Sequence, residues 1–133
     1  MKYFTTTYRV IYGDLDAMKV AYYGNYLRWF EIGRTELIRH LGLPYAEIEA
    51  RGFFLPVSEA YCKYAKSARY DEILSIATAP GFIRRASLRF DYRITDQENG
   101  LIAEGYTIHA CLDPNGRLVR LPESIRSLLE NWQ

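Results

Sequence analysis

Residues 12–31 read YGDLDAMKVAYYGNYLRWFE and place two aspartates one residue apart, directly before an apolar, tyrosine-rich run. A carboxylate beside apolar surface costs free energy unless it is solvated, paired or used in chemistry. The run that follows Asp16 then changes into a charged segment with helical spacing. The central question is therefore whether Asp14 and Asp16 serve a turn, a helix end or a reaction.

A long helix is predicted over residues 23–41, because apolar residues recur there at helical spacing while charged residues lie off that stripe. Gly42 followed by Pro44 is a helix stop signal. A short second helix is expected over residues 44–52. Gly33 falls on the apolar stripe, which predicts close approach of another element. The stripe consists of Tyr26, Phe30, Gly33, Leu37 and Leu41.

The rest of the chain has the alternation typical of strands. It is cleanest over residues 85–95, where apolar side chains at even positions alternate with polar ones, as in an antiparallel sheet with one wet face. Further strands are expected over residues 4–12, 53–64, 71–79 and 101–112, and an amphipathic helix over residues 121–132. Residues 4–12 should direct Phe4, Thr6, Tyr8, Val10 and Tyr12 to one face.

Length and composition limit the class of protein. A chain of 133 residues is expected to form a single domain over residues 1–133. Seventeen basic and sixteen acidic residues nearly cancel, so no nucleic-acid partner is expected. The chain shows neither a signal peptide at its N-terminus nor a membrane span, which predicts a cytoplasmic protein. Cys62 and Cys111 lack metal-binding spacing, so we expect inert thiols and neither metal nor cofactor.

Three motifs carry a resemblance to a known family. They are YGDLDA at residues 12–17, followed by Val20, Tyr22, Asn25 and Tyr26; FEIGRTE at residues 30–36; and ARYDEIL at residues 68–74. In these motifs and in the order of its elements, the chain resembles the hotdog-fold acyl-CoA thioesterases of the 4-hydroxybenzoyl-CoA thioesterase type, nearest to the Tol–Pal-associated branch. The resemblance implies an α+β hotdog fold, a curved antiparallel sheet wrapped around one long central helix, with a C-terminal helix.

The resemblance also implies an activity, the hydrolysis of a fatty or aromatic acyl-CoA thioester to free acid and coenzyme A. Asp16 matches the family's catalytic carboxylate, which acts as nucleophile or general base. The backbone N–H of Tyr23 matches the donor that faces the thioester carbonyl. Elementary electrostatics agrees, because a helix N-terminus carries unpaired donors and a partial positive charge. Asn25 remains an alternative as a helix cap.

Structural explanations compete for each of these residues. From spacing alone, Asp14 and Asp16 are solvated turn residues or a capping pair, and no further carboxylate follows at EF-hand spacing. With the resemblance, Asp16 is assigned to catalysis and Asp14 to structure. Glu31 lies at helical spacing from arginines, which predicts an ion pair. His40 and His109 accompany no nucleophile motif and are assigned structural roles.

Two departures from the family pattern affect the expected active site. Met18 and Lys19 occupy positions where the family commonly has glycines, and Tyr23 occupies a position where it often has histidine. Met18, Tyr22 and Asn25 are expected to contact the substrate. Five basic residues are candidates for the phosphates of coenzyme A, although such residues usually form a solvated rim. They are Lys63, Lys66, Arg69, Arg84 and Arg85.

Two other functions share this fold, because fold alone does not fix activity. One is a non-catalytic acyl-CoA-binding or scaffold protein. The other is a dehydratase, which would need a histidine paired with an acid in the site, and neither histidine lies at the helix start. Self-association is expected in either case. One long helix covers only one face of the sheet, and edge strands over residues 53–64 or 101–112 would stay open. We therefore expect a homodimer, or a homotetramer of paired dimers.

Overall fold

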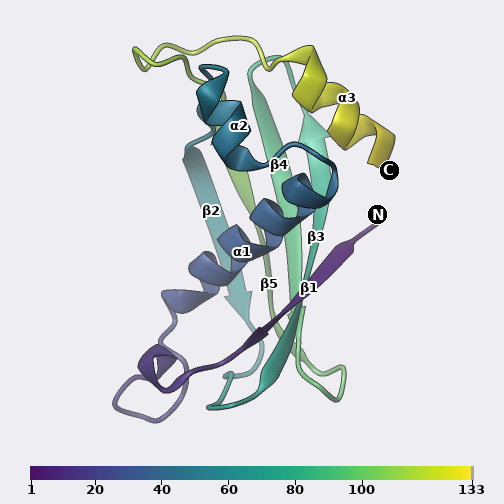
Figure 1. Ribbon diagram of the computed structural model, residues 1–133. Coiled ribbons are helices and arrows are strands. Elements are labelled where there is room, and N and C mark those ends of the chain that lie inside the picture. The colour runs from purple at the N-terminus through teal and green to yellow at the C-terminus, as the bar shows by residue number, and fades with distance from the viewer. Residues whose placement is uncertain (133) are drawn as a thin grey trace.

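A five-stranded antiparallel sheet in the order β1-β3-β4-β5-β2 carries three helices on one face, with α1 crossing its centre (Figure 1). The computed structural model describes residues 1–132. The expected α+β architecture of a curved sheet around a long helix is confirmed. The elements are β1 (Phe4–Arg9), the 3-10 turn η1 (Tyr12–Asp14), α1 (Asn25–His40), α2 (Tyr45–Ala50), β2 (Val57–Tyr64), β3 (Ile73–Ile83), β4 (Ser87–Thr95), β5 (Leu101–Ala110) and α3 (Glu123–Trp132).

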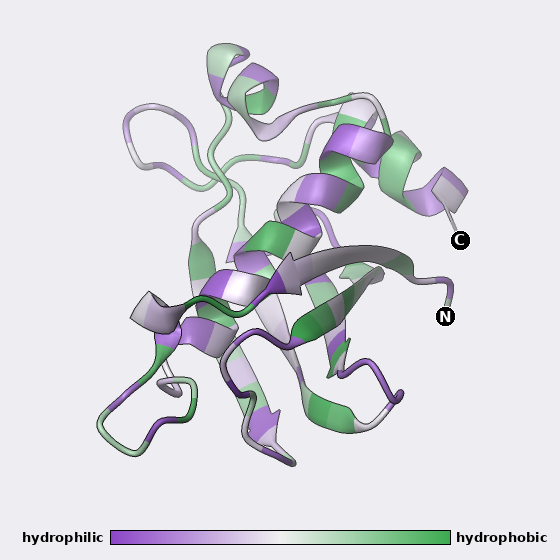
Figure 2. Ribbon diagram, turned by 60° about the horizontal axis from the view of Figure 1, so that its bottom comes forward, coloured by the Kyte–Doolittle hydropathy of each residue, from purple (hydrophilic) through white to green (hydrophobic). Residues whose placement is uncertain are grey.

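The alternation predicted for β4 decides which face of the sheet forms the core. Leu88, Phe90, Tyr92 and Ile94 are all buried, while the arginines between them lie on the other face. Figure 2 shows hydrophobic and hydrophilic residues alternating along the strands and along α1. The ring of Phe30 on α1 stacks on Tyr92 with centroids 4.2 Å apart. The helix therefore packs on the predicted apolar face.

Gly33 lies where α1 passes closest to β3. A Cβ atom at this position would lie 2.3 Å from Thr78 Oγ1 and 2.8 Å from Ile76 Cγ2, which is shorter than any normal contact. Only a residue without a side chain permits this approach. The close approach expected from the sequence is confirmed, and it fixes how deeply α1 sits in the curved sheet.

Some expected boundaries are wrong for physical reasons. β1 ends at Arg9, and Tyr12 belongs to η1 with 68% of its surface exposed, so it is not on the inward face. β3 continues beyond residue 79 through Pro80. The pairing of β1 with β3 ends at Thr78, so Pro80 has no β1 partner that would need its missing N–H. β2 begins only at Val57.

β2 is the last strand of the sheet, and every residue of it except Cys62 is exposed.

Cys62 is partly buried and Cys111 is buried, and burial raises the pKa of both thiols, as expected for inert cysteines. Among residues 1–132, no helix combines the length and the apolar character that crossing a bilayer would require.

Candidate active site

The loop between η1 and α1 projects from the body of the protein and carries Asp16 (Figures 1 and 2). A bridge between Leu15 and Ala21 closes the loop, and Asp16 N–H donates to Val20 O at 2.9 Å. Lys19 adopts a left-handed conformation with φ of 65°. Glycine adopts this conformation without strain, so the loop keeps a shape that suits a glycine although lysine occupies it.

Asp16 lies in a hollow of about 350 Å³ beside the start of α1. One carboxylate oxygen, Oδ1, accepts the Met18 backbone N–H at 2.7 Å. Within residues 1–132, Oδ2 receives no hydrogen bond, which leaves it available for chemistry. The hollow is lined by Asp16, Met18, Val20, Ala21, Tyr23, Tyr26, Tyr64, Ala65, Lys66 and Ser67.

Asp14 has a different environment, because it is buried and holds the loop in place. Its Oδ2 accepts the Tyr8 hydroxyl at 2.8 Å and the Ile11 N–H at 2.9 Å. Its backbone oxygen accepts the Tyr22 N–H and the side-chain amide of Asn25, both at 2.8 Å. Asn25 thus ties the helix start to Asp14 and does not cap the helix.

The N-terminus of α1 offers unpaired donors. Gly24 is the N-cap residue, and no side chain among residues 1–132 caps the helix. The backbone N–H groups of Tyr23 and Gly24 donate no hydrogen bond to any group within residues 1–132. Together with the helix dipole, such donors can stabilise a negatively charged oxygen. The Asp16 carboxylate and N–H donors that can stabilise an oxyanion therefore occur at the same end of α1.

Tyrosines surround these donors. Tyr22 packs against Tyr23 with ring centroids 4.7 Å apart, and the Tyr64 hydroxyl donates to Tyr23 O at 3.1 Å. The Tyr26 hydroxyl accepts the Ala68 N–H at 3.0 Å. Although almost half of the Tyr64 surface is exposed, partial desolvation is the largest of the causes that raise its pKa to about 12, so this ring stays neutral at physiological pH. The result is an apolar, uncharged wall around the helix start.

Of the five basic residues that are candidates for binding the phosphates of coenzyme A, Lys66 is the one that lines the same hollow as Asp16. Its Nζ contacts Asp96 Oδ2 at 2.5 Å, and this hydrogen bond raises the pKa of Lys66 and lowers that of Asp96. Lys63 and Arg69 are exposed, on β2 and on the segment before β3. These three cations belong to the same end of the sheet.

Arg84 and Arg85 lie at the opposite end of the sheet, in the turn between β3 and β4 (Figure 1). β3 has eleven residues, so about 33 Å separates its two ends. The guanidinium of Arg84 stacks over the Phe82 ring at 3.8 Å, and its backbone oxygen accepts Arg126 Nη2. Within one chain, the structure therefore does not bring these two arginines to Asp16.

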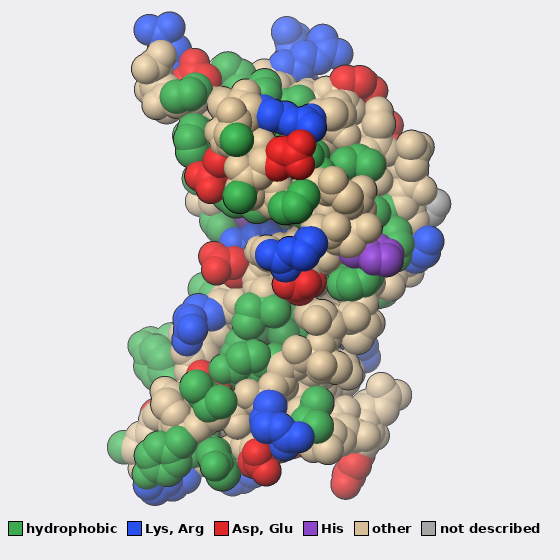
Figure 3. Space-filling model, viewed as in Figure 1, with side chains coloured by type: hydrophobic (Ala, Val, Ile, Leu, Met, Phe, Trp, Pro, Cys, Tyr) green, Lys and Arg blue, Asp and Glu red, His purple; other side chains and the backbone are tan. Residues whose placement is uncertain are grey.

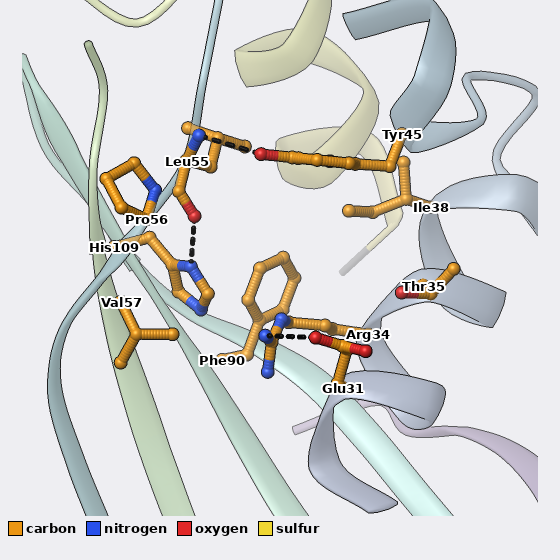
Figure 4. A pocket seen from close by; sticks show the side chains of 10 residues that line it. All are labelled: Glu31, Arg34, Thr35, Ile38, Tyr45, Leu55, Pro56, Val57, Phe90 and His109. Carbon is orange, nitrogen blue, oxygen red and sulfur yellow. Dashed lines mark hydrogen bonds and ion pairs between the residues drawn. The ribbon is translucent and has the colours of Figure 1, made fainter. Parts of the chain in front are cut away.

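A second cavity, of about 440 Å³, lies beside the C-terminal half of α1 and was not expected from the sequence (Figure 4). His109 is buried in its wall, and burial is the main cause that lowers the pKa of this imidazole to about 4. The expected ion pair of Glu31 exists, at 3.8 Å from Arg34. The lining consists of Glu31, Arg34, Thr35, Ile38, Tyr45, Leu55, Pro56, Val57, Phe90 and His109.

Comparison with known proteins relates this geometry to a family. Residues 10–129 match the model described as "Thioesterase-like superfamily". The acyl-CoA thioester hydrolase YbgC of Escherichia coli O157:H7 is 36% identical, over 88% of each chain. The crystal structure of a hypothetical protein from Thermus thermophilus is 33% identical with a TM-score of 0.91, covering 97% of this chain and 98% of that one. The DHNA-CoA thioesterase structure from Staphylococcus aureus is 30% identical with a TM-score of 0.91, covering 99% of this chain and 89% of that one.

Proposed function

This chain belongs to the thioesterase-like superfamily of hotdog-fold proteins, and from that premise we propose that it hydrolyses an acyl-CoA thioester to a free acid and coenzyme A. The observation that carries the proposal is that Asp16 lines the same hollow as Tyr23, at the start of α1, where the Tyr23 and Gly24 N–H groups donate no hydrogen bond within residues 1–132. A carboxylate and oxyanion donors are the two components that thioester cleavage needs.

In the proposed mechanism, the thioester oxygen binds at the Tyr23 N–H, where negative charge develops as the carbonyl carbon becomes tetrahedral. The preorganised donors and the helix dipole stabilise that charge without reorganisation. Tyr22, Tyr23 and Tyr64 are each about half exposed or more within one chain, so bound substrate or a second subunit would have to cover them to lower the local dielectric and strengthen these interactions. Met18 and Tyr22 contact the acyl group or the pantetheine arm.

Asp16 supplies the reacting oxygen, and Oδ2 is the better candidate because the Met18 N–H already engages Oδ1. As a nucleophile, Oδ2 attacks the carbonyl carbon, the coenzyme A thiolate leaves and takes a proton, and water cleaves the mixed anhydride. As a general base, Oδ2 removes a proton from the water that attacks. In a single turnover in ¹⁸O-labelled water, a product acid without ¹⁸O identifies the anhydride route with water attack at the Asp16 carbonyl, since the general-base route always places a water oxygen in the product.

The direct test of the function is a free-thiol assay against short-chain, long-chain and aromatic acyl-CoAs. We expect turnover with at least one fatty or aromatic substrate. Binding of acyl-CoA without thiol release would favour the second candidate, a non-catalytic acyl-CoA-binding protein. That alternative is considered because Met18 and Lys19 depart from the glycines of the family.

Hydrolysis should require no divalent metal, because backbone N–H groups rather than a Lewis acid are proposed to stabilise the oxyanion. Full activity is expected after exhaustive chelation. Activity that disappears with the chelator and returns with one specific divalent ion would contradict this assignment.

Coenzyme A is proposed to bind with its phosphates near Lys63, Lys66 and Arg69, at the sheet end that carries Asp16. Charge-assisted contacts of this kind fall with ionic strength when they are exposed. Arg84 and Arg85 can join the same site only if a second subunit brings them there. We propose a homodimer or homotetramer, in line with the exposed edge strand β2.

A further inference from the structure

Two neighbouring peptide groups carry the unpaired N–H donors at the start of α1. The Tyr23 N–H belongs to the Tyr22–Tyr23 peptide, and the Gly24 N–H belongs to the Tyr23–Gly24 peptide. Both peptides are trans, so the C=O and N–H bonds of each one point in opposite directions. A group that binds the carbonyl oxygen of such a peptide therefore also fixes the direction of its N–H.

The two carbonyl oxygens are held in different ways. Tyr22 O accepts the Asn25 N–H at 2.9 Å, a contact within the turn that leads into α1. Tyr23 precedes the N-cap residue, so its carbonyl oxygen lies outside the regular hydrogen bonds of the helix, and the bond from the Tyr26 N–H is long, at 3.4 Å. The shorter bond to Tyr23 O, at 3.1 Å, comes from the Tyr64 hydroxyl on β2.

The Tyr64 ring is supported by a buried neighbour. It meets the Tyr26 ring edge-on, with centroids 5.0 Å apart and planes at 88°. Tyr26 is buried and anchored, because its hydroxyl accepts the Ala68 N–H at 3.0 Å. The pKa of Tyr64, about 12, keeps its hydroxyl protonated at physiological pH. Tyr64 therefore remains a donor toward Tyr23 O.

Gly24 cannot supply this restraint itself. A Cβ atom at Gly24 would lie 2.7 Å from Tyr22 Cε2, so glycine is the residue that lets the Tyr22 ring pack here. Glycine also has the widest choice of backbone angles, so the Tyr23–Gly24 peptide is weakly fixed by its own sequence. The hydrogen bond from Tyr64 provides the restraint that the local sequence lacks.

We propose that Tyr64 is a positioning residue for the oxyanion site, whose hydroxyl holds the Tyr23–Gly24 peptide and so fixes the N–H groups that receive the thioester oxygen. This inference rests on the proposed thioesterase function. The bond exists before substrate binds, so the peptide needs no reorientation as negative charge develops. A hydrogen bond to the carbonyl oxygen also polarises the peptide, which makes its N–H a stronger donor. Tyr64 acts through the backbone and takes no part in proton transfer.

Thiol release from hexanoyl-CoA, palmitoyl-CoA and benzoyl-CoA by Tyr64→Phe, which keeps the ring and removes the hydroxyl, tests this role. On the substrate that the wild type hydrolyses fastest, kcat and kcat/KM should fall together by about fivefold to tenfold, the effect of losing one hydrogen bond that matters in the transition state. KM should stay within about twofold of the wild type. Tyr61→Phe is the matched control on the opposite face of β2, where the ring stacks on Tyr106, and should leave both constants unchanged.

A spectroscopic measurement tests the hydrogen bond without substrate. Labelling tyrosine with ¹³C at the carbonyl and glycine with ¹⁵N selects peptides in which glycine follows tyrosine, and the sequence contains two, Tyr12–Gly13 and Tyr23–Gly24. In a nuclear magnetic resonance spectrum, Tyr64→Phe should move the carbonyl signal of Tyr23–Gly24 and leave that of Tyr12–Gly13 in place. Tyr61→Phe should move neither signal. The melting temperature and the mass by light scattering should match the wild type in both variants.

Three results would overturn the positioning role and leave the proposed function intact. The first is wild-type kcat in Tyr64→Phe, or a Tyr23–Gly24 signal that does not move. The second is a higher KM with unchanged kcat, which would assign the hydroxyl to substrate binding. The third is a lower melting temperature or a smaller mass of Tyr64→Phe that accounts for its lower kcat. If the wild type releases no thiol from any of the three esters, the proposed function itself is contradicted, and this role with it.

Discussion

At the residue scale, Asp14 and Asp16 show how one motif divides two tasks. Asp14 is buried and its Oδ2 accepts from both Tyr8 and Ile11, whereas Asp16 is half-buried in a hollow and its carboxylate accepts one hydrogen bond within residues 1–132, at Oδ1. Asp16→Asn should fold normally and lose thioesterase activity by about 10²-fold to 10⁴-fold, the usual contribution of an acid–base group. Thiol release and circular dichroism check the two halves of this expectation.

Asp14→Asn is the matched control for that variant. The side-chain carbonyl oxygen of the introduced asparagine can still accept from Tyr8 and Ile11, so activity should fall far less than in Asp16→Asn. Near wild-type turnover in Asp16→Asn would remove the catalytic assignment.

The buried His109 makes stability depend on pH. Burial lowers its folded-state pKa to about 4, below the ordinary value of 6.5, so between these values the unfolded chain binds the proton and the folded chain does not. Its contribution is complete above about pH 6.5 and is lost as pH falls toward 4, by up to about 3 kcal/mol. Urea unfolding of the wild type and His109→Gln at several pH values tests this. A slope that the substitution leaves unchanged would exclude His109 as its source.

At the element scale, Gly33 sets the distance between α1 and β3. Alanine favours an exposed helix by up to about 1 kcal/mol over glycine, but here its Cβ would overlap Thr78 and Ile76. We expect Gly33→Ala to lower the free energy of unfolding by about 1–3 kcal/mol, as overpacking does. Chemical denaturation measures it, with Arg39→Ala as the exposed control on the same helix. A stabilised Gly33→Ala would mean that the two elements separate without cost.

The sequence predicted best those helices and strands in which apolar residues recur at a single regular spacing. β4 begins two residues after its predicted start and ends where predicted, because alternation and burial agree along its whole length. The start of α1 was harder to place, since no Ser, Thr or Asp precedes Asn25 as a cap and the donors stay unpaired. The strand predicted to end at residue 79 continues through Pro80, which is possible because the pairing of β1 with β3 ends at Thr78.

The hollow of Asp16 and the second cavity also differ in how far local sequence patterns could predict them. Asp16 and Tyr23 are seven residues apart, so their proximity follows from one loop and could be predicted from the sequence. A chain of hydrogen bonds through Arg34, Tyr92, Thr107 and His109 joins α1, β4 and β5 with the segment before β2. Alternation assigned these side chains to faces, but the hydrogen bonds between them depend on the strand register and on the position of the helix.

At the scale of the whole molecule, exposed apolar side chains concentrate on one region. Figure 3 shows hydrophobic side chains gathered at the lower left of this face, and the exposed set includes Met18 at 80% and Tyr23 at 64%. β2 adds an exposed edge that carries Val57, Tyr61 and Tyr64. Monomeric proteins usually blunt such an edge or cover it.

Pairing of β2 edges across a two-fold axis would cover this surface, so we expect a mass of two or four chains by light scattering at low micromolar concentration. A stable interface of this kind should bury more than about 2,000 Å² in total. Ala60→Lys puts a charge on the exposed β2 edge and should shift the protein toward the monomer, whereas Thr7→Lys on the opposite edge strand β1 should leave at least a dimer. If the catalytic site needs both subunits, thiol release should fall with the loss of the dimer in Ala60→Lys and persist in Thr7→Lys. A stable monomer that still hydrolyses thioesters would contradict both the oligomer and the shared site.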